Sequence, residues 1–296
     1  MNKLKTETKL QLIMLKGLPA SGKSTYAEEL INSNGNFIRV NKDLISKMLY
    51  FGKFTPKNRT DVISLEESIA ELYLTEGKSV IVDDTNLRQS DEDKWRNISI
   101  KHGAEFSIVE MKTDWVECIE RDSNRVDKVG EYVIKNFALE IGQVDGEFVI
   151  CDLDGTLCDI SDRLHLVKPD GGEKNWKAFF ENIPSDKLRE DIAEMVKLLY
   201  NDGKKIVYLS GRPEEYKKET IEWLKENGMD FNFSLIMRRV ADRRDDVIVK
   251  REMLNKYFKD RSKIFKVIDD RPKVVALWKE ELGEDRVIDV GNCIDF

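Results

Sequence analysis

The sequence is poor in the side chains that usually hold zinc. Its 296 residues include only four cysteines and two histidines. The cysteines are Cys118, Cys151, Cys158 and Cys293, and no two of them form a Cys-x-x-Cys pair. A structural zinc site is therefore not expected, and reduced thiols are the default expectation for a protein of the cytosol.

Long apolar runs are also missing. No run approaches the roughly 20 residues that a membrane-spanning helix needs. The N-terminal residues Met1–Glu7 contain no apolar signal core. We therefore expect a cytoplasmic protein that contacts no membrane.

A third absence is an excess of positive charge. Lys and Arg total 49 against 56 for Asp and Glu, which gives a net charge of −7. This balance argues against a protein that coats nucleic acid through charge alone, because such binding needs many phosphate contacts. It is compatible with an enzyme that grips only a strand end, and acidic residues also collect where magnesium is held.

What the sequence does contain is a repeated alternation of strand-like and helix-like segments. The expected strands are 10–16, 37–40, 79–82, 106–111, 148–153, 205–209, 235–237, 264–268 and 287–290. The expected helices are 24–31, 42–50, 63–76, 91–101, 114–122, 188–201, 214–226, 247–257 and 273–282. In the helix at 63–76, the expected inward positions are Ile63, Ile69, Leu72 and Tyr73. Such alternation is typical of parallel α/β sheets.

The segment Ile141–Glu147 interrupts this alternation with two glycines and is the expected linker. At one domain per roughly 100–200 residues, the length fits two domains. We place them at residues 1–143 and 147–296. Both are expected to be doubly wound parallel sheets that bind ligands at the carboxyl ends of their strands.

The first expected ligand site is a phosphate-binding loop. Gly17-Leu-Pro-Ala-Ser-Gly-Lys-Ser24 matches GxxxxGK[ST] and lies between a strand and a helix. Backbone N–H groups of such a loop surround phosphate oxygens, while Lys23 reaches the outer phosphates and Ser24 offers its hydroxyl to magnesium. The expected phosphate-binding residues are Gly17, Ser21, Gly22, Lys23, Ser24 and Thr25.

Polar residues follow the next two strands of this domain. Asp43 could accept the proton of an attacking hydroxyl, or could be the N-cap of the helix that begins there. Asp83 or Asp84 could assist magnesium or orient Asp43. Thr85 and Asn86 either line an acceptor pocket, together with Asp84, or cap a turn.

Two arginines follow later in the same domain. Arg121 and Arg125 lie four residues apart, so on a helix they would share a face. Guanidinium groups suit the spread charge of phosphoryl transfer. The spacing alone, however, favours an ordinary exposed helix face.

The strongest motif begins the second domain. Val149-Ile-Cys-Asp-Leu-Asp-Gly-Thr-Leu157 ends a buried strand in Asp152 and places Asp154 on the same face of an extended segment. Two carboxylates with magnesium suit a covalent phosphoryl mechanism, in which one attacks phosphorus and the other handles protons. The alternative is a calcium-like turn, which does not predict the polar groups that follow later strands.

Those polar groups are present. Ser210-Gly-Arg212 ends a strand in a hydroxyl that can bind a phosphate oxygen. Lys250 lies near the start of a helix and can neutralise a phospho-aspartate. Asp269 and Asp270 end another strand in paired carboxylates suited to magnesium.

The motifs DxDGT, SGR, Lys and IDD, in this order, resemble the haloacid-dehalogenase phosphatase superfamily over the whole second domain. With the phosphate loop, the chain is similar to the phage-type polynucleotide 5′-kinase/3′-phosphatases over nearly its full length. The matching pieces are Gly17–Ser24, Asn41–Asp43, Asp84–Leu87, Trp115–Arg125, Asp152–Leu157, Ser210–Arg212, Asp246 with Lys250, and Asp269–Arg271. The resemblance implies a P-loop kinase domain followed by a haloacid-dehalogenase-like phosphatase domain, with ATP as phosphate donor and Mg²⁺ as cofactor.

For the kinase, the resemblance implies that Asp43 is the general base for a 5′-hydroxyl. Arg125 would be a catalytic lid residue on the donor phosphates, with Arg121 in support. The family can carry an arginine three residues after the base, where it grips the acceptor phosphate. Ser46 stands at that position here, with Lys47 next.

For the phosphatase, the resemblance implies that Asp152 is the nucleophile and Asp154 the general acid and then base. Magnesium would be held by Asp270, Asp152 and the carbonyl of Asp154, with Asp269 in support, and the phosphate by Ser210, Gly211, Arg212 and Lys250. The insert at 161–180 allows two interpretations. Arg163, His165 and Trp176 form a substrate mouth where rings stack on bases, or Trp176 packs locally with Phe179 and Phe180.

The leading hypothesis is an end-healing enzyme that phosphorylates a 5′-hydroxyl of RNA or DNA and removes a 3′-phosphate through a phospho-aspartate. Its expected partners are RNA or DNA strand ends, a separate nucleic-acid ligase and, through the resemblance, further copies of the chain. One alternative is a small-molecule kinase fused to a metabolite phosphatase. Another is a binding subunit that docks a ligase and uses ATP only as a structural ligand.

Overall fold

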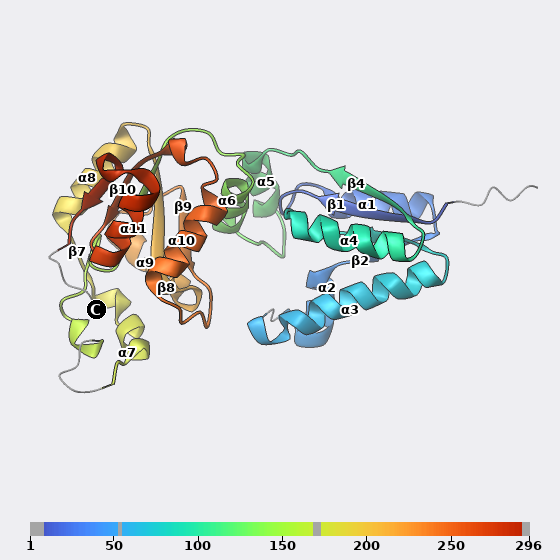
Figure 1. Ribbon diagram of the computed structural model, residues 1–296, viewed down its shortest axis with the longest axis horizontal. Coiled ribbons are helices and arrows are strands. Elements are labelled where there is room, and N and C mark those ends of the chain that lie inside the picture. The colour runs from blue at the N-terminus through green and yellow to red at the C-terminus, as the bar shows by residue number, and fades with distance from the viewer. Residues whose placement is uncertain (1–8, 53–54, 168–172, 292–296) are drawn as a thin grey trace, which may run out of the picture. The chain divides into compact units, whose positions relative to one another are not determined.

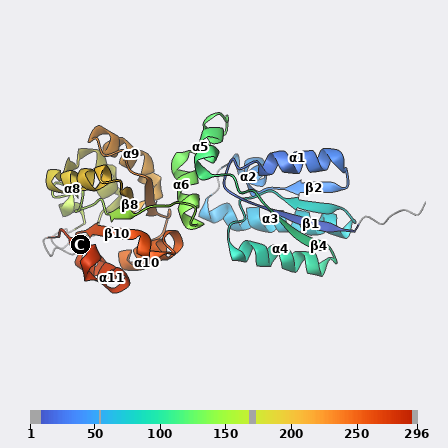
Figure 2. The same ribbon diagram turned by 90° about the horizontal axis from the view of Figure 1, so that it is seen from above.

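The computed structural model describes residues 9–52, 55–167 and 173–291, and the chain forms two compact units, Met1–Ile134 and Lys135–Phe296. Each unit is a parallel sheet covered by helices (Figures 1 and 2). Within the described ranges, no helix is long and apolar enough to cross a membrane. Cys293 lies outside the described residues.

The described residues of the first unit form a four-stranded parallel sheet in the order β2-β3-β1-β4. Its strands are β1 (Gln11–Lys16), β2 (Phe37–Val40), β3 (Ser79–Val82) and β4 (Glu105–Glu110). The helices are α1 (Lys23–Ser33), α2 (Lys42–Tyr50), α3 (Pro56–Thr75), α4 (Gln89–Lys101), α5 (Trp115–Ser123) and α6 (Glu131–Glu140).

Strand β1 shows why this sheet is covered on both faces. Its side chains alternate between the faces, so Leu12 and Met14 pack with α3 and α4, while Ile13 and Leu15 pack with α1. Figure 2 shows α1 and α4 on opposite sides of the sheet. With both faces buried, the strand ends and their loops are the places where polar groups can gather.

The second unit is built on a five-stranded parallel sheet in the order β11-β10-β5-β8-β9. Its strands are β5 (Phe148–Cys151), β8 (Lys205–Pro213), β9 (Ser234–Arg238), β10 (Ile264–Asp269) and β11 (Val287–Asp289). The covering helices are α8 (Glu190–Asn201), α9 (Lys217–Glu226), α10 (Asp246–Tyr257) and α11 (Pro272–Leu282). This arrangement confirms the expected α/β class.

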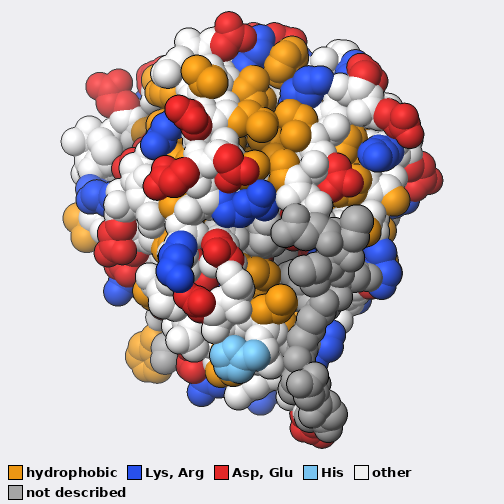
Figure 3. All heavy atoms as spheres, turned by 90° about the vertical axis from the view of Figure 1, so that its left-hand side faces the viewer, with side chains coloured by type: hydrophobic (Ala, Val, Ile, Leu, Met, Phe, Trp, Pro, Cys, Tyr) orange, Lys and Arg blue, Asp and Glu red, His pale blue; other side chains and the backbone are white. Residues whose placement is uncertain are grey.

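Smaller elements extend the second unit. The antiparallel pair β6 (Cys158–Asp159) and β7 (Lys187–Leu188) leads to and from the short helix α7 (Trp176–Glu181), which stands off one end of the sheet (Figure 1). Short 3₁₀ turns lie at Leu164–Leu166, Ile183–Ser185, Glu214–Tyr216, Arg261–Lys263 and Glu284–Arg286. The face in Figure 3 carries acidic and basic side chains intermixed, as the near balance of charges leads one to expect.

Helix α3 differs from its prediction. It begins at Pro56, and Leu72, which was expected to face inward, is 55% exposed. The described buried positions are Asn58, Val62, Glu66, Ala70 and Leu74, each four residues from the next. A charged residue and an alanine on the inner face conceal its apolar period, which made the prediction for Leu72 wrong.

Helix α6 was not predicted. The division between the two compact units falls inside it, between Ile134 and Lys135. The domain limits at residues 143 and 147 stay a prediction.

Candidate active sites

The first candidate site lies in the turn between β1 and α1. Gly17 has a φ of 152°, and a Cβ there would lie 2.8 Å from Ser21 Oγ and 2.9 Å from the backbone oxygen of Met111. Gly22, with a φ of 102°, precedes the first residue of α1. The loop can therefore close only around glycine at position 17, and it leaves the first N–H groups of α1 at its centre.

Lys23 is buried inside this loop. Its Nζ donates to the backbone oxygens of Leu18 at 2.6 Å and Gly17 at 3.0 Å, and to Ser21 Oγ at 3.3 Å. Burial lowers the pKa of Lys23 to about 8, although the carboxylate of Asp83 acts against this shift. The geometry fits a cradle for the phosphates of a nucleotide.

Ser24 and Thr25 are exposed at the start of α1. The Oγ of Ser24 accepts a hydrogen bond from Arg39 at 3.3 Å, and the Nε of Arg39 donates to Asp83 Oδ2 at 2.7 Å. The guanidinium group of Arg39 thus binds both the Ser24 hydroxyl and the Asp83 carboxylate. Both are oxygen ligands of the kind that magnesium prefers.

Asp43 lies in the first turn of α2 but does not cap it. The N-cap is Asn41, whose Oδ1 accepts from Leu44 N at 2.9 Å, so the N-cap interpretation of Asp43 is wrong. The side chain of Asp43 stays accessible to solvent. Partial burial, followed by the negative charge of Asp84, raises its pKa, which favours proton uptake from a hydroxyl.

Asp84 is buried behind this turn. It accepts from Lys42 N at 3.2 Å and pairs with Lys42 Nζ at 3.3 Å. Glu66 of α3 is fully buried, and this burial, with Asp84 beside it, raises the pKa of Glu66 to about 9. Glu66 is therefore protonated at neutral pH, and no sequence motif marks it.

Thr85 and Asn86 brace the phosphate loop from behind. The backbone oxygen of Thr85 accepts from Gly17 N at 3.1 Å. The Nδ2 of buried Asn86 donates to Leu15 O at 2.8 Å. These bonds support the turn interpretation for both residues, and an acceptor contact by either stays a prediction.

Arg121 and Arg125 do not share a helix face, contrary to the prediction, because α5 ends at Ser123. Arg121 pairs with Glu117 at 2.5 Å, and its NH1 lies 3.6 Å from where a Cβ on Gly22 would stand. It therefore borders the phosphate loop.

Arg125 lies in the segment between α5 and α6. Its NH2 is 3.3 Å from Asp127 Oδ1. After burial, the charge of Arg125 is among the causes that lower the pKa of Lys23, so this guanidinium acts on the phosphate loop. Buried Asp122 fixes the segment by accepting from Val129 N at 3.2 Å and Gly130 N at 2.9 Å. The sequence gave no signal for this role of Asp122.

The second candidate site joins the ends of β5 and β10 to α10. Lys250 Nζ lies 2.9 Å from Asp152 Oδ1 and 2.8 Å from Asp269 Oδ2. Although burial opposes its charge, these carboxylates hold the pKa of Lys250 well above its usual value. Trp278 Nε1 donates to the same oxygen of Asp269 at 3.0 Å. Three of the predicted residues therefore meet.

Asp270 completes an oxygen cluster suited to a divalent cation. One ligand oxygen from each of Asp152, Asp269 and Asp270 lies within 4.8 Å of the others. Thr156 Oγ1 holds Asp270 at 2.9 Å, and a Cβ on Gly155 would lie 2.1 Å from Asp270 Oδ2. Burial, then the charge of Asp269, raises the pKa of Asp270 to about 6. Crowded, buried carboxylates fit Mg²⁺, whose charge would offset their repulsion.

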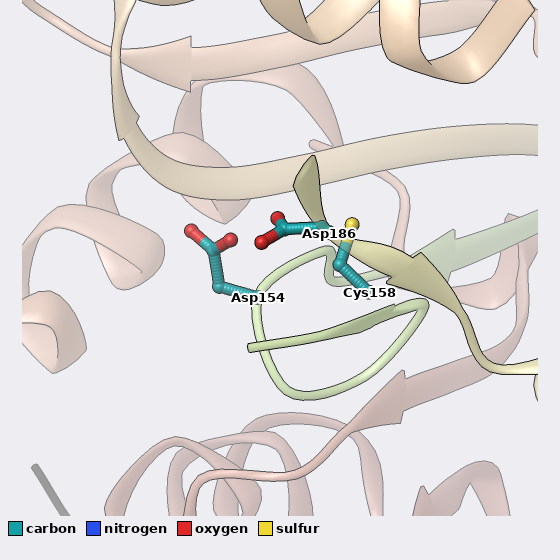
Figure 4. Close-up of side chains that lie close together, drawn as sticks. All are labelled: Asp154, Cys158 and Asp186. Carbon is teal, nitrogen blue, oxygen red and sulfur yellow. The ribbon is translucent and has the colours of Figure 1, made fainter. Parts of the chain in front are cut away.

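Asp154 and Asp186 lie close together (Figure 4). Two buried guanidinium groups, those of Arg163 and Arg212, pair with both carboxylates. Arg212 NH2 lies 2.6 Å from Asp154 Oδ1 and 3.1 Å from Asp186 Oδ2, and Arg163 also bonds both carboxylates. Although burial opposes the charge, Arg212 and then Arg163 hold the pKa of Asp154 well below its usual range. Cys158 lies beside these two acids (Figure 4), and the three side chains together resemble a metal site. Because the arginines already neutralise both carboxylates, we assign no metal ion to this cluster.

The Ser-Gly-Arg run divides between two environments. Ser210 and Gly211 line a cavity together with Asp152 and Asp154. Arg212 is fully buried and pairs with Asp154, so it does not line this cavity with Ser210 and Gly211. Lys250 is not among the lining residues either, although it pairs with Asp152, which is. A Cβ on Gly211 would lie 2.5 Å from Asp246 Oδ1. Any larger residue would therefore clash with Asp246, which explains the glycine at this position.

The insert supports parts of both interpretations. Arg163 is buried, with its guanidinium 3.9 Å from the Phe179 ring, so it does not belong to a mouth. Trp176 packs on Phe179 and Phe180, as the local-packing interpretation holds, and yet Trp176 also lines the cavity. His165 is exposed.

Two family models match the chain, one on each unit. Residues 146–290 match the polynucleotide kinase PNKP phosphatase domain, and residues 12–139 match an AAA domain. Domains of these two kinds generally use ATP and Mg²⁺. These matches confirm the predicted order of a kinase-type domain and a haloacid-dehalogenase-type phosphatase domain, and they do not favour the metabolite alternative.

Individual proteins are also similar to this chain. A protein of the Autographa californica nuclear polyhedrosis virus, assigned as a bifunctional polynucleotide kinase/RNA ligase, is 28% identical over 94% of this chain. The chain spans 43% of that relative's length. A chain of the Pnkp1/Rnl/Hen1 RNA repair complex is 25% identical, with 99% of this chain and 100% of that one covered and a TM-score of 0.42. The Mycobacterium tuberculosis APS kinase CysC is 21% identical, with 39% and 70% covered and a TM-score of 0.34. The viral relative belongs to a nuclear polyhedrosis virus, so the phage part of the expectation is not shown.

Proposed function

We propose that this chain, which joins a P-loop kinase domain to a phosphatase domain of the polynucleotide kinase family, prepares broken RNA or DNA ends for joining. It would transfer the γ-phosphate of ATP to a 5′-hydroxyl and hydrolyse a 3′-phosphate. The observation that carries the proposal is the meeting of Asp152, Lys250, Asp269 and Asp270 inside a domain that matches polynucleotide phosphatases.

In the kinase half, Asp43 takes the proton of the 5′-hydroxyl. The hydroxyl oxygen bonds to the γ-phosphorus while the bond from that phosphorus to the β-phosphate oxygen breaks. The raised pKa and the accessible position of Asp43 support this role. Lys23 and the loop N–H groups hold the donor phosphates. Arg121 and Arg125 stabilise the charge on the transferred group, since Arg121 borders Gly22 and Arg125 acts on Lys23.

In the phosphatase half, an oxygen of Asp152 bonds to phosphorus as the bond to the 3′-oxygen breaks, and Asp154 protonates the leaving oxygen. Water then attacks the phospho-aspartate and returns a proton to Asp154, so inorganic phosphate leaves and both acids are restored. Ser210 and Lys250 hold the phosphate. Mg²⁺ bound by Asp152 and Asp270, with Asp269 in support, would offset the negative charge of the phosphate and the carboxylates.

The ion pairs of Asp154 define its starting state. Arg163 and Arg212 hold it as a carboxylate, which is the form that accepts the proton of water in the second step. For the first step, Asp154 takes up one proton from solvent as the substrate binds. After the phosphate leaves, it gives this proton back to solvent, which restores the starting carboxylate. Arg212 therefore acts here as a positioning residue for Asp154, and a direct phosphate contact by Arg212 stays a prediction.

An end-group assay tests both halves. One oligonucleotide with a 5′-hydroxyl and a 3′-phosphate, in RNA and DNA versions, is incubated with Mg²⁺ and labelled ATP. We expect label at the 5′ end and release of the 3′-phosphate. Asp43→Ala should lose only the 5′-kinase activity, and Asp152→Asn only the 3′-phosphatase activity. The activity that each variant retains shows that its chain is still folded. Full activity of either variant would contradict the role given to its residue.

A nucleic-acid ligase is the partner that fits this chemistry, because a 5′-phosphate and a 3′-hydroxyl are the ends that a ligase joins. The viral relative, whose description combines a polynucleotide kinase with an RNA ligase, supports this proposal. The homo-oligomer implied by the resemblance stays a prediction.

A further inference from the structure

The cavity above the phosphatase carboxylates is larger than a phosphate group requires. Its volume is about 1250 Å³, with Asp152, Asp154 and Ser210 among its lining residues. Pockets for small ligands commonly measure about 300–1,000 Å³. A substrate whose phosphate reaches Asp152 therefore leaves room for further groups of the same molecule.

One wall of this cavity is aromatic. Trp176 and Phe180 of α7 are stacked at 5.9 Å with an angle of 22° between their rings. Phe180 in turn lies 5.3 Å from Tyr216, and all three line the cavity. Trp176 is 41% exposed. An exposed ring on a rigid aromatic support is suited to stacking on a flat ligand group.

The loop between β9 and α10 also lines the cavity and carries arginines. Arg238 is held by Asp246 at 2.8 Å, and Arg244 by Asp242 at 2.7 Å and Glu252 at 2.6 Å. For Arg243, by contrast, the described part of the chain shows no hydrogen bond or ion pair. Among the arginines that line the cavity here, Arg243 is therefore the exposed guanidinium whose charge is left for a ligand.

We propose that the Trp176–Phe180 wall stacks on the unpaired terminal base of a 3′-phosphorylated strand, while Arg243 binds the phosphate that precedes it. This inference rests on the proposed phosphatase function and specifies its substrate as an unpaired end with at least two nucleotides. Stacking is tolerant of base identity because every base has a flat face. The site thus accepts any terminal sequence.

The test uses the full-length protein and a 3′-phosphorylated DNA oligonucleotide in two forms, with and without the terminal base. For the wild-type protein, kcat/KM should be about tenfold or more lower on the abasic form. Trp176→Ala should lose a similar factor on the complete strand and little more on the abasic one, whereas Trp176→Phe should retain most activity. Annealing a complementary strand over the terminal base should also slow the wild-type protein.

Tyr200→Ala is the matched control for the aromatic wall. Tyr200 is an exposed aromatic residue of α8, 45% accessible and packed on Phe231 at 4.5 Å, and it is not among the lining residues. This variant should match the wild-type protein on both substrates. Arg243→Ala should slow both substrates equally and lower the salt dependence of KM, whereas Arg239→Ala, an exposed neighbour outside the lining, should not.

The outcomes separate the two levels of the proposal. If the wild-type protein releases phosphate from neither strand, the phosphatase function itself fails. If it acts on both strands at equal rates, or if paired and unpaired ends react equally, the stacking site is refuted while the function stands. Equal losses of Trp176→Ala on complete and abasic strands would also refute stacking.

Discussion

Each candidate site buries one lysine, and the two lysines respond in opposite ways. Lys23 meets neutral oxygens of its own loop, so the cost of burying its charge dominates and its pKa falls to about 8. Lys250 meets Asp152 and Asp269, so attraction overcomes burial and its pKa rises. The difference follows from the partner atoms, since both side chains are deeply buried.

Lys23 should couple nucleotide binding to proton uptake. Its pKa of about 8 means that the free protein loses this proton as pH rises through 8. Bound phosphate favours the charged form, so binding at pH 8.5 should take up a proton. Affinity for ATP should fall about 25-fold between pH 7.5 and 9.5. Calorimetry in two buffers of different ionisation enthalpy measures this uptake.

Lys23→Met is the control for that experiment. It should bind ATP more weakly and show no proton uptake assignable to this site. Proton uptake of equal size in the variant, or none in the wild-type protein at pH 8.5, would contradict the assignment.

At the residue scale, motifs predicted the residues that act on phosphate better than those that support them. Asp152, Lys250, Asp269 and Asp270 meet because each ends a strand or begins a helix at one edge of a parallel sheet. Asp186 and Glu66 had no such signal. Their positions depend on tertiary contacts, with arginines for Asp186 and with Asp84 for Glu66.

At the element scale, the start of α2 connects the kinase residues. Asn41 caps the helix through Leu44 N, and its Nδ2 donates to the backbone oxygen of Asp83. One side chain thus fixes both the first turn, which carries Asp43, and the end of β3. Changing it should affect catalysis as well as stability.

Asn41→Ala should reduce the free energy of unfolding of the first unit by about 1–2 kcal/mol, because a cap and a partly buried hydrogen bond are lost. The kcat of the kinase should fall at least about tenfold, since small misplacements of a reacting group are costly. KM for ATP should change little. Urea unfolding and kinase kinetics measure these effects.

Asn41→Ser keeps a capping oxygen but lacks the amide donor, so it should recover stability more than kcat. Asp260→Ala, which removes the cap of a 3₁₀ turn in the second unit, should leave kinase activity unchanged. A loss of stability in Asn41→Ala with unchanged kcat would show that the cap does not position Asp43.

Elements were predictable where apolar period and turn residues agree, as in β1 and α1. Elements were harder to predict where polar residues interrupt the apolar period. Glu66 on the inner face of α3 led to the wrong orientation of Leu72. The end of α5 at Ser123 placed Arg125 in a loop, because Asp122 draws in the backbone of Val129 and Gly130. Such side chain–backbone bonds have no periodic signature.

At the scale of the whole molecule, an acidic chain concentrates part of its charge inside the second unit. Burial and Asp269 raise the pKa of Asp270 to about 6, against a usual value of 3.8. The folded state therefore binds this proton more tightly than the unfolded state. Stability falls as pH rises from about 4 through 6, and the cost is fully present at neutral pH.

Magnesium should remove this cost and so stabilise the protein more at neutral than at acidic pH. At pH 7.5, 10 mM Mg²⁺ should raise the melting temperature of the second unit by at least about 3 °C. At pH 5 the shift should be smaller, because the proton on Asp270 competes with the ion. Asp270→Asn should melt higher than the wild-type protein without Mg²⁺ at pH 7.5 and should lose most of the shift. Asp202→Asn, which changes an exposed carboxylate of the same unit, should keep it. Scanning calorimetry measures the wild-type protein at both pH values and the two variants at pH 7.5. Asp270 would be excluded as a ligand if the Mg²⁺ shift were equal at both pH values, or if Asp270→Asn kept the full shift.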